Sequence, residues 1–172
     1  VAHVEDRVLD EEGASVPVRI YVSHPEDSGD GPRDVVLFVH GGGHMAGDLD
    51  VYDHQARRTA VATGMVVVSV DYRLAPEHPF PAGLEDTHRV VTSLAGGLDG
   101  IATTGRIHAV AGSGGGAVVA SIAMRAAAGE WSSPIERQVL LYPSLDYTMS
   151  GESIERLGTG HFLSSERIAW YF

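Results

Sequence analysis

The chain contains no cysteine. This absence excludes disulfides, a thiol nucleophile and any metal site built on cysteine. Basic residues are also scarce, with 12 Lys and Arg against 23 Asp and Glu, which gives a formal net charge of −11. Such a charge argues against nucleic acid as a partner. No apolar run is long enough to span a membrane, and no signal-peptide pattern opens the chain. We therefore expect a cytoplasmic protein without a membrane span.

The length and composition of the chain are those of a globular domain. The 172 residues are 44% hydrophobic and 20% charged, so we expect a single domain, residues 1–172, with a sizeable core. The first residue is Val1 and not Met. We expect that the natural N-terminus has been lost or processed.

Strand-like and helix-like segments alternate along the chain. Two strands joined by a turn at Glu12-Gly13 are expected to form a hairpin, and Pro25 to Arg33 reads as a surface loop. Strands are expected over residues 3–9, 16–22, 34–39, 65–70, 106–111 and 137–142, and helices over residues 53–62, 82–94 and 114–128. Strands separated by helices predict an α/β fold, with a mostly parallel sheet and helices on both faces.

The apolar run from Val35 to Val39 ends in His40 and three glycines, Gly41, Gly42 and Gly43. Glycine has no Cβ, so this backbone can turn sharply and expose its N–H groups. At the carboxyl end of a buried strand, such donors lie where α/β sheets bind ligands. Two converging N–H groups stabilise the oxyanion of an acyl-transfer intermediate. An ordinary Gly-rich strand-to-helix loop is the alternative interpretation.

A second motif places Ser113 between a short strand and an Ala-rich helix. Ala111, Gly112, Gly114 and Gly115 flank the serine, and residues this small allow the tight turn known as a nucleophile elbow. The N–H of Gly114 would be a third oxyanion donor, and the helix dipole would favour an alkoxide. Taken alone, this serine could equally cap the helix or belong to an anion-binding loop.

Several further strings resemble the esterases and lipases of the hormone-sensitive-lipase branch of the α/β-hydrolase fold. They are His40 to Gly43, Asp71 to Ala82, Glu85-Asp86, Leu141 to Pro143 and Gly160 to Phe162. With Ser113 among them, the similarity extends over nearly the whole chain. The Tyr-Arg-Leu-Ala-Pro-Glu string is the most specific of them. The resemblance implies hydrolysis of carboxylic esters, often short-chain ones, through a Ser-Asp-His triad and with no cofactor or metal.

This resemblance also implies the roles of individual residues. Ser113 would be the nucleophile, and Gly41, Gly42 and Gly114 would form the oxyanion hole, with support from His40 and Gly43. We expect Asp71, Arg73 and Glu77 to brace the loop beneath these glycines through charged hydrogen bonds. The sequence around Ser113, from Ala111 to Gly115, departs from the Gly-Asp-Ser-Ala-Gly pattern that is usual in the family. Ungapped alignment keeps Ser113 in register, whereas a gapped alternative puts Gly114 at the serine's position and leaves no nucleophile.

The sequence of this chain does not identify the acid and the base of the triad. Family members place an Asp or Glu and then a His after later strands, and the sequence ends at Phe172 before reaching them. His161 is the only histidine downstream of Ser113, and it matches a lid-proximal segment of the family. A triad through Asp146 and His161 is the alternative. We expect the N-terminal and central part of a larger hydrolase core, without its cap and last strands.

Three functional hypotheses follow, all without a bound metal. The first is a serine carboxylesterase acting on a small-molecule ester. The second is a catalytically inactive hydrolase fold that binds a small ligand. The third is an interaction module: if the sheet ends at residues 137–142, an apolar edge strand is left unpaired. A second chain, or a segment outside these residues, would then complete the sheet.

Overall fold

A computed structural model describes residues 1–11, 14–24 and 31–171, without the side chains of residues 10, 11 and 14. The turn expected at Glu12-Gly13 and most of the loop expected from Pro25 lie outside the described residues. The strands are β1 (His3–Glu11), β2 (Ala14–Val22), β3 (Arg33–Val39), β4 (Val66–Val70), β5 (Thr103–Gly112) and β6 (Ile135–Leu141). The helices are α2 (Asp53–Thr63), α3 (Ala82–Ala95), α4 (Gly114–Ala127), α5 (Glu152–Leu157) and α6 (Ser165–Tyr171).

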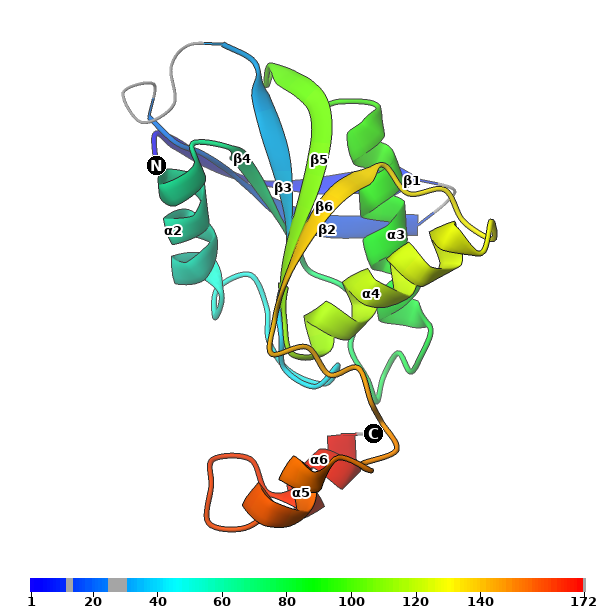
Figure 1. The fold of residues 1–172 in the computed structure, drawn as a ribbon. Helices are drawn as coiled ribbons and strands as arrows, with labels where there is room; N and C mark the ends of the chain where they lie inside the picture. Colours follow the sequence, from blue (N-terminus) through cyan, green and yellow to red (C-terminus); the bar gives the residue numbers. More distant parts are fainter. Residues whose placement is uncertain (12–13, 25–30, 172) are drawn as a thin grey trace.

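The strands form one mixed sheet in the order β1-β2-β4-β3-β5-β6. The pairs from β4 through β3 and β5 to β6 are parallel, whereas β1 and β2 join antiparallel. Helix α2 covers one face, and α3 and α4 cover the other (Figure 1). The expected α/β fold, with a mostly parallel sheet and helices on both faces, is therefore confirmed.

The two faces of β3 explain its uninterrupted apolar sequence. Val35, Leu37 and Val39 belong to the core beneath α3 and α4, whereas Val36 and Phe38 pack in a smaller core with α2. A strand buried on both faces reads as a continuous apolar run because neither side meets water. Such burial fixes the strand firmly, and the loop that follows it leaves from a rigid support.

The carboxyl ends of β3 and β5 lie side by side. In the parallel register, Val39 is opposite Ala111, so the chain leaves both strands at the same edge of the sheet. The His40 glycine loop follows one strand and the Ser113 turn follows the other. Two motifs more than 60 residues apart in the sequence are thereby brought together.

Strand β6 forms one edge of the sheet. Val139 is 54% exposed and Leu141 is 46% exposed, so the apolar side chains of this strand lack the cover that its neighbours have. Among the described residues, no strand pairs with the outer side of β6, as the sequence predicted. Natural proteins normally pair or cover such an edge, because a bare strand templates aggregation.

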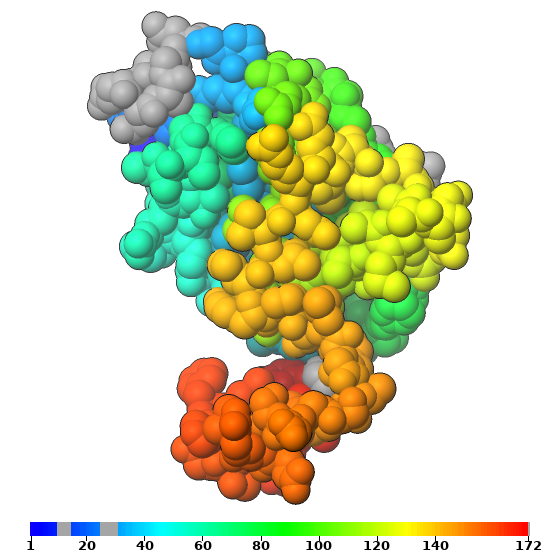
Figure 2. Space-filling model, viewed as in Figure 1, coloured from blue at the N-terminus to red at the C-terminus, as the bar shows by residue number. Residues whose placement is uncertain are grey.

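Helices α5 and α6 were not expected from the sequence. They form a unit that projects beyond the carboxyl ends of the strands (Figures 1 and 2), and none of their residues is buried. The unit is held by Ser165, whose N–H donates to the Gly158 carbonyl at 2.9 Å and whose hydroxyl donates to the Ile154 carbonyl at 3.0 Å. In the described ranges, no helix is long and apolar enough to cross a membrane.

Candidate active site

Ser113 occupies the turn between the end of β5 and the start of α4. Its backbone angles are φ 51° and ψ −122°, a left-handed region that non-glycine residues seldom adopt. The turn is fixed by backbone bonds, since the Ser113 N–H donates to Leu141 at 3.0 Å and its carbonyl accepts from Gly116 at 3.0 Å. The strand-to-helix turn predicted from the glycine pattern is present, with Ser113 and not Gly114 at its apex.

Gly115 lets the elbow come close to β3. A Cβ built on this residue would lie 2.3 Å from the carbonyl oxygen of His40 and 2.4 Å from that of Val39. Both obstacles are backbone atoms at the buried end of β3 and cannot move aside. Only a glycine at this position lets α4 begin against the end of β3.

Gly41 lies directly beside the serine as a result. A Cβ built on Gly41 would be 3.2 Å from the Cβ of Ser113 and 3.2 Å from the carbonyl oxygen of Gly112. The first residue of the glycine loop therefore contacts the elbow. Gly42 and Gly43 continue the turn with φ of 120° and 62°, values that glycine adopts without strain.

Two hydrogen bonds orient the peptide groups of the glycine loop. The Tyr72 hydroxyl donates to the His40 carbonyl at 2.8 Å, and His40 Nδ1 donates to the Gly41 carbonyl at 2.7 Å. In a trans peptide the C=O and the following N–H point in opposite directions. With both carbonyls held on the side of Tyr72 and His40, the N–H groups of Gly41 and Gly42 are directed away from that side.

His40 itself is buried, with 1% of its surface exposed. Its ring stacks with Tyr72 at a centroid separation of 4.4 Å and with Tyr52 at 5.1 Å. Burial lowers the pKa of His40, because charge is costly to place among apolar groups. The neutral tautomer that carries its proton on Nδ1 is the one that can donate to Gly41.

Stability is expected to decrease as the pH falls below about 6.5, the ordinary pKa of histidine in an unfolded chain. Burial lowers the pKa of both His40 and His44, so the unfolded chain binds protons in this range while the folded protein does not. Urea unfolding at pH 5 and pH 7.5 measures the difference.

His40→Gln provides the comparison for this pH series, because it removes one titrating group. Asp71, whose pKa burial raises, titrates in the opposite sense and stays in both proteins. We expect a smaller loss of stability between pH 7.5 and pH 5 in the variant than in the parent. Equal pH dependence in the two proteins would show that His40 does not titrate as described.

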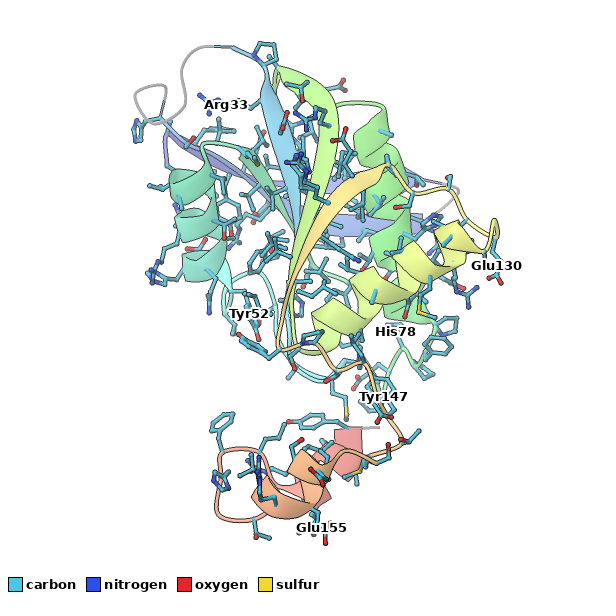
Figure 3. The ribbon with its side chains drawn as sticks, viewed as in Figure 1. Arg33, Tyr52, His78, Glu130, Tyr147 and Glu155 are labelled. Atoms are coloured by element: carbon cyan, nitrogen blue, oxygen red, sulfur yellow. The ribbon has the colours of Figure 1, made fainter. Side chains whose placement is uncertain are left out.

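Ser113 opens into a cavity of about 410 Å³. Gly41, Tyr52, Leu141 and Tyr142 are among its lining residues. Figure 3 shows Tyr52 at the end of α2 that faces the carboxyl ends of the strands. The space is large enough for a small ligand beside the serine.

A second cavity of about 560 Å³ lies between the segment after β4, the starts of α3 and α4, and Tyr147. His44 lies between this cavity and the elbow: its ring is 3.3 Å from a Cβ built on Gly114, and its Nε2 hydrogen-bonds to the Tyr147 hydroxyl at 2.7 Å. Tyr171 of α6 also lines this cavity, and its ring packs against Gly43. His78 and Tyr147 mark this region in Figure 3.

The structure corrects the prediction that Asp71, Arg73 and Glu77 support the glycine loop through charged hydrogen bonds. Arg73 pairs with Asp86 of α3, through two bonds of 2.8 Å, and not with the loop. Asp86 is nearly inaccessible to solvent, so a guanidinium is needed to compensate its charge. Within the described residues, the carboxylates of Asp71 and Glu77 make no hydrogen bond or ion pair. The loop is instead held by its backbone, with Ala75 N–H donating to the His44 carbonyl at 2.9 Å.

Asp146 and His161 form hydrogen bonds with residues close to them in the sequence. The Asp146 carboxylate accepts bonds from the Thr148 backbone, the Thr148 hydroxyl and Ser150, which lower its pKa. His161 is exposed, and its Nδ1 contacts the Thr159 carbonyl at 3.0 Å. In the part of the chain that the structure describes, no carboxylate pairs with His161 and no histidine nitrogen hydrogen-bonds to the Ser113 hydroxyl. The same residues contain no group of three or more His, Asp or Glu side chains arranged to hold a metal ion.

Sequence and structure comparisons agree on the family. The sequence profile of the α/β hydrolase fold matches residues 36–172, so the chain belongs to this family, as the motifs indicated. Esterase LipI of Mycobacterium tuberculosis is 39% identical over 179 residues, which cover 98% of this chain and 55% of LipI. The ethyl acetate hydrolase of Pseudomonas putida is 30% identical over 162 residues, covering 94% of this chain and 51% of that protein.

Solved structures give the same result. The chain superposes on an esterase from Pyrobaculum calidifontis with a TM-score of 0.85 and 35% identity, covering 99% of this chain and 55% of that one. The chain therefore spans about half the length of the relatives that it matches.

Two residues of this site were not singled out from the sequence. Tyr72 lies within the Tyr-Arg-Leu-Ala-Pro-Glu string, and Tyr52 lies 12 residues after His40. Nothing in the local pattern distinguishes either from a core aromatic. Only the three-dimensional arrangement shows that their hydroxyls reach the glycine loop.

Proposed function

We propose that the protein containing this chain is a carboxylic-ester hydrolase in which Ser113 is the nucleophile. The strained turn that places Ser113 against Gly41 carries the proposal. In this mechanism the serine oxygen attacks the ester carbonyl, a tetrahedral intermediate forms and the alcohol leaves. Water then hydrolyses the acyl-enzyme.

The N–H groups of Gly41, Gly42 and Gly114 are proposed to bind the oxyanion of that intermediate. Gly114 is the first residue of α4, so its N–H has no partner within the helix, and the helix dipole adds to the attraction. The bonds from Tyr72 and His40 support the required direction of the other two donors. Donors that are fixed before the reaction cost no reorganisation when charge develops.

A general base must remove the proton of Ser113, since a serine hydroxyl is a weak nucleophile when protonated. We propose that this base and its acidic partner come from outside the described residues. The local contacts of Asp146 and His161 support this, as does the engagement of His44 with Tyr147. The free side of β6 supports a related proposal, that a further strand pairs there and completes the sheet.

Short-chain esters are the proposed substrates. The space beside Ser113 is modest, and one relative is named for hydrolysis of ethyl acetate. A series of p-nitrophenyl esters from acetate to laurate, assayed with the full-length protein, tests this. We expect kcat/KM to be highest for acetate to butyrate and at least about tenfold lower for laurate, a difference of about 1.4 kcal/mol. Highest activity on laurate would contradict the preference, and no hydrolysis of any ester would contradict the proposed function.

A further inference from the structure

Tyr52 brings a phenol hydroxyl to the same side of Gly41 as the serine. It directly precedes α2 and lines the cavity into which Ser113 opens. A Cβ built on Gly41 would lie 3.3 Å from the Tyr52 hydroxyl oxygen and 3.2 Å from Ser113 Cβ. The hydroxyl and the nucleophile therefore flank one point at the start of the glycine loop.

The ring of Tyr52 lies beside two aromatic neighbours. It stacks with His40, with an angle of 26° between the ring planes, and lies 6.4 Å from Phe38 between centroids. Both neighbours are buried at the end of β3. A ring fixed in this way presents its hydroxyl to the cavity without having to be ordered by substrate.

The hydroxyl is protonated at neutral pH and is available as a donor. Burial raises the pKa of Tyr52, an effect that a hydrogen bond from the Gly41 backbone partly offsets. The position of the Tyr52 oxygen, 3.3 Å from a Cβ built on Gly41, also places the phenol beside the Gly41 backbone. An oxyanion bound by the Gly41 N–H would lie next to the phenol, which can turn its own proton toward the negative charge.

We propose that the Tyr52 hydroxyl is a fourth hydrogen-bond donor to the tetrahedral intermediate, beside the three backbone N–H groups. This inference rests on the proposed function. No proton is transferred from the phenol, and the bond strengthens as the substrate carbonyl oxygen gains charge. Tyr52 therefore stabilises the transition state more than the bound ester.

Tyr52→Phe in the full-length protein tests the inference, because it retains the stacked ring and removes only the hydroxyl. Loss of one oxyanion donor elsewhere lowers kcat by about 10²–10³-fold. With three other donors remaining, we expect a fall in kcat of about 10- to 100-fold on p-nitrophenyl acetate and a KM within about twofold of the parent. The inhibition constant of a short alkylboronic acid, which forms a tetrahedral adduct on serine, is expected to rise by the same factor as kcat falls.

Tyr21→Phe is the matched control. It also removes a phenol hydroxyl near α2, but this one donates to Asp53 at 3.1 Å and Tyr21 is not among the residues lining the cavity at Ser113, so kcat is expected to be unchanged. A thermal melt of each variant shows that the protein is folded. Unchanged kcat in Tyr52→Phe, or a lower kcat with unchanged boronate inhibition, would overturn the role of Tyr52. If the parent hydrolyses no ester and binds no boronate, the proposed function itself has failed.

Discussion

Replacing Ser113 with alanine is expected to lower kcat of the full-length protein on p-nitrophenyl acetate by about 10⁶-fold. In the proposed mechanism alanine removes the atom that forms the acyl-enzyme, and loss of a serine nucleophile elsewhere has an effect of about this size. Alanine has one atom fewer than serine and should leave the fold intact, although it shares the strained backbone angles of the turn. The comparison requires purified parent and variant at matched concentration, with circular dichroism to confirm folding.

Ser93→Ala is the matched control for this experiment. Ser93 lies near the end of α3 and lines neither of the two cavities beside the elbow, so its replacement is expected to leave kcat unchanged. A Ser113→Ala protein that retained activity within about tenfold of the parent would show that another group attacks the ester. The gapped alignment of the elbow, with no serine nucleophile, would then have to be reconsidered.

The second large effect concerns the general base. Residues 1–172 expressed alone are expected to hydrolyse activated short-chain esters at a rate about 10⁴–10⁶-fold below that of the full-length protein, or not measurably. The proposed oxyanion donors would remain, but Ser113 would keep its proton. Parallel assays of the two proteins, each with its Ser113→Ala variant, measure the difference.

His161→Ala tests the alternative in which Asp146 and His161 complete the triad. His161 is exposed and contacts only its own loop, so this change is expected to have no effect on either protein. Robust turnover by residues 1–172 that disappeared in both Ser113→Ala and His161→Ala would contradict the account. It would show that His161 is the base and that the triad lies within these residues.

Much of the fold could be predicted because its signals are local. The apolar run at Val35 to Val39 is continuous because α2 covers one face of β3 and α3 and α4 cover the other. The alternation of strands and helices then leads to a mostly parallel sheet. The boundaries of α3 follow equally local signals, since the helix begins directly after Pro81 and ends before two glycines.

The parts that could not be predicted depend on contacts distant in the sequence. Arg73 has acidic residues close by at Asp71 and Glu77, yet it pairs with Asp86, 13 residues away on a helix. The hydroxyl of Tyr72 reaches a carbonyl 32 residues away. Spacing along the chain does not reveal either partner, because the sheet register and the packing of α3 decide them.

Helices α5 and α6 were missed for a different reason. Each spans at most seven residues, and both are stabilised by a few contacts and not by a buried apolar face. Short helices of this kind have no regular apolar spacing to detect. The contact of Tyr171 with Gly43 could not be predicted without them.

Covalent labelling tests the central claim most directly. The full-length protein is treated with a small organophosphate such as diethyl p-nitrophenyl phosphate, and the modified residue is located by peptide mass spectrometry. We expect one phosphoryl group per chain, on Ser113, with loss of esterase activity in proportion to labelling and no labelling of Ser113→Ala. Inactivation with the phosphoryl group on another residue, or activity that persists after complete labelling of Ser113, would contradict the assignment of Ser113 as the nucleophile.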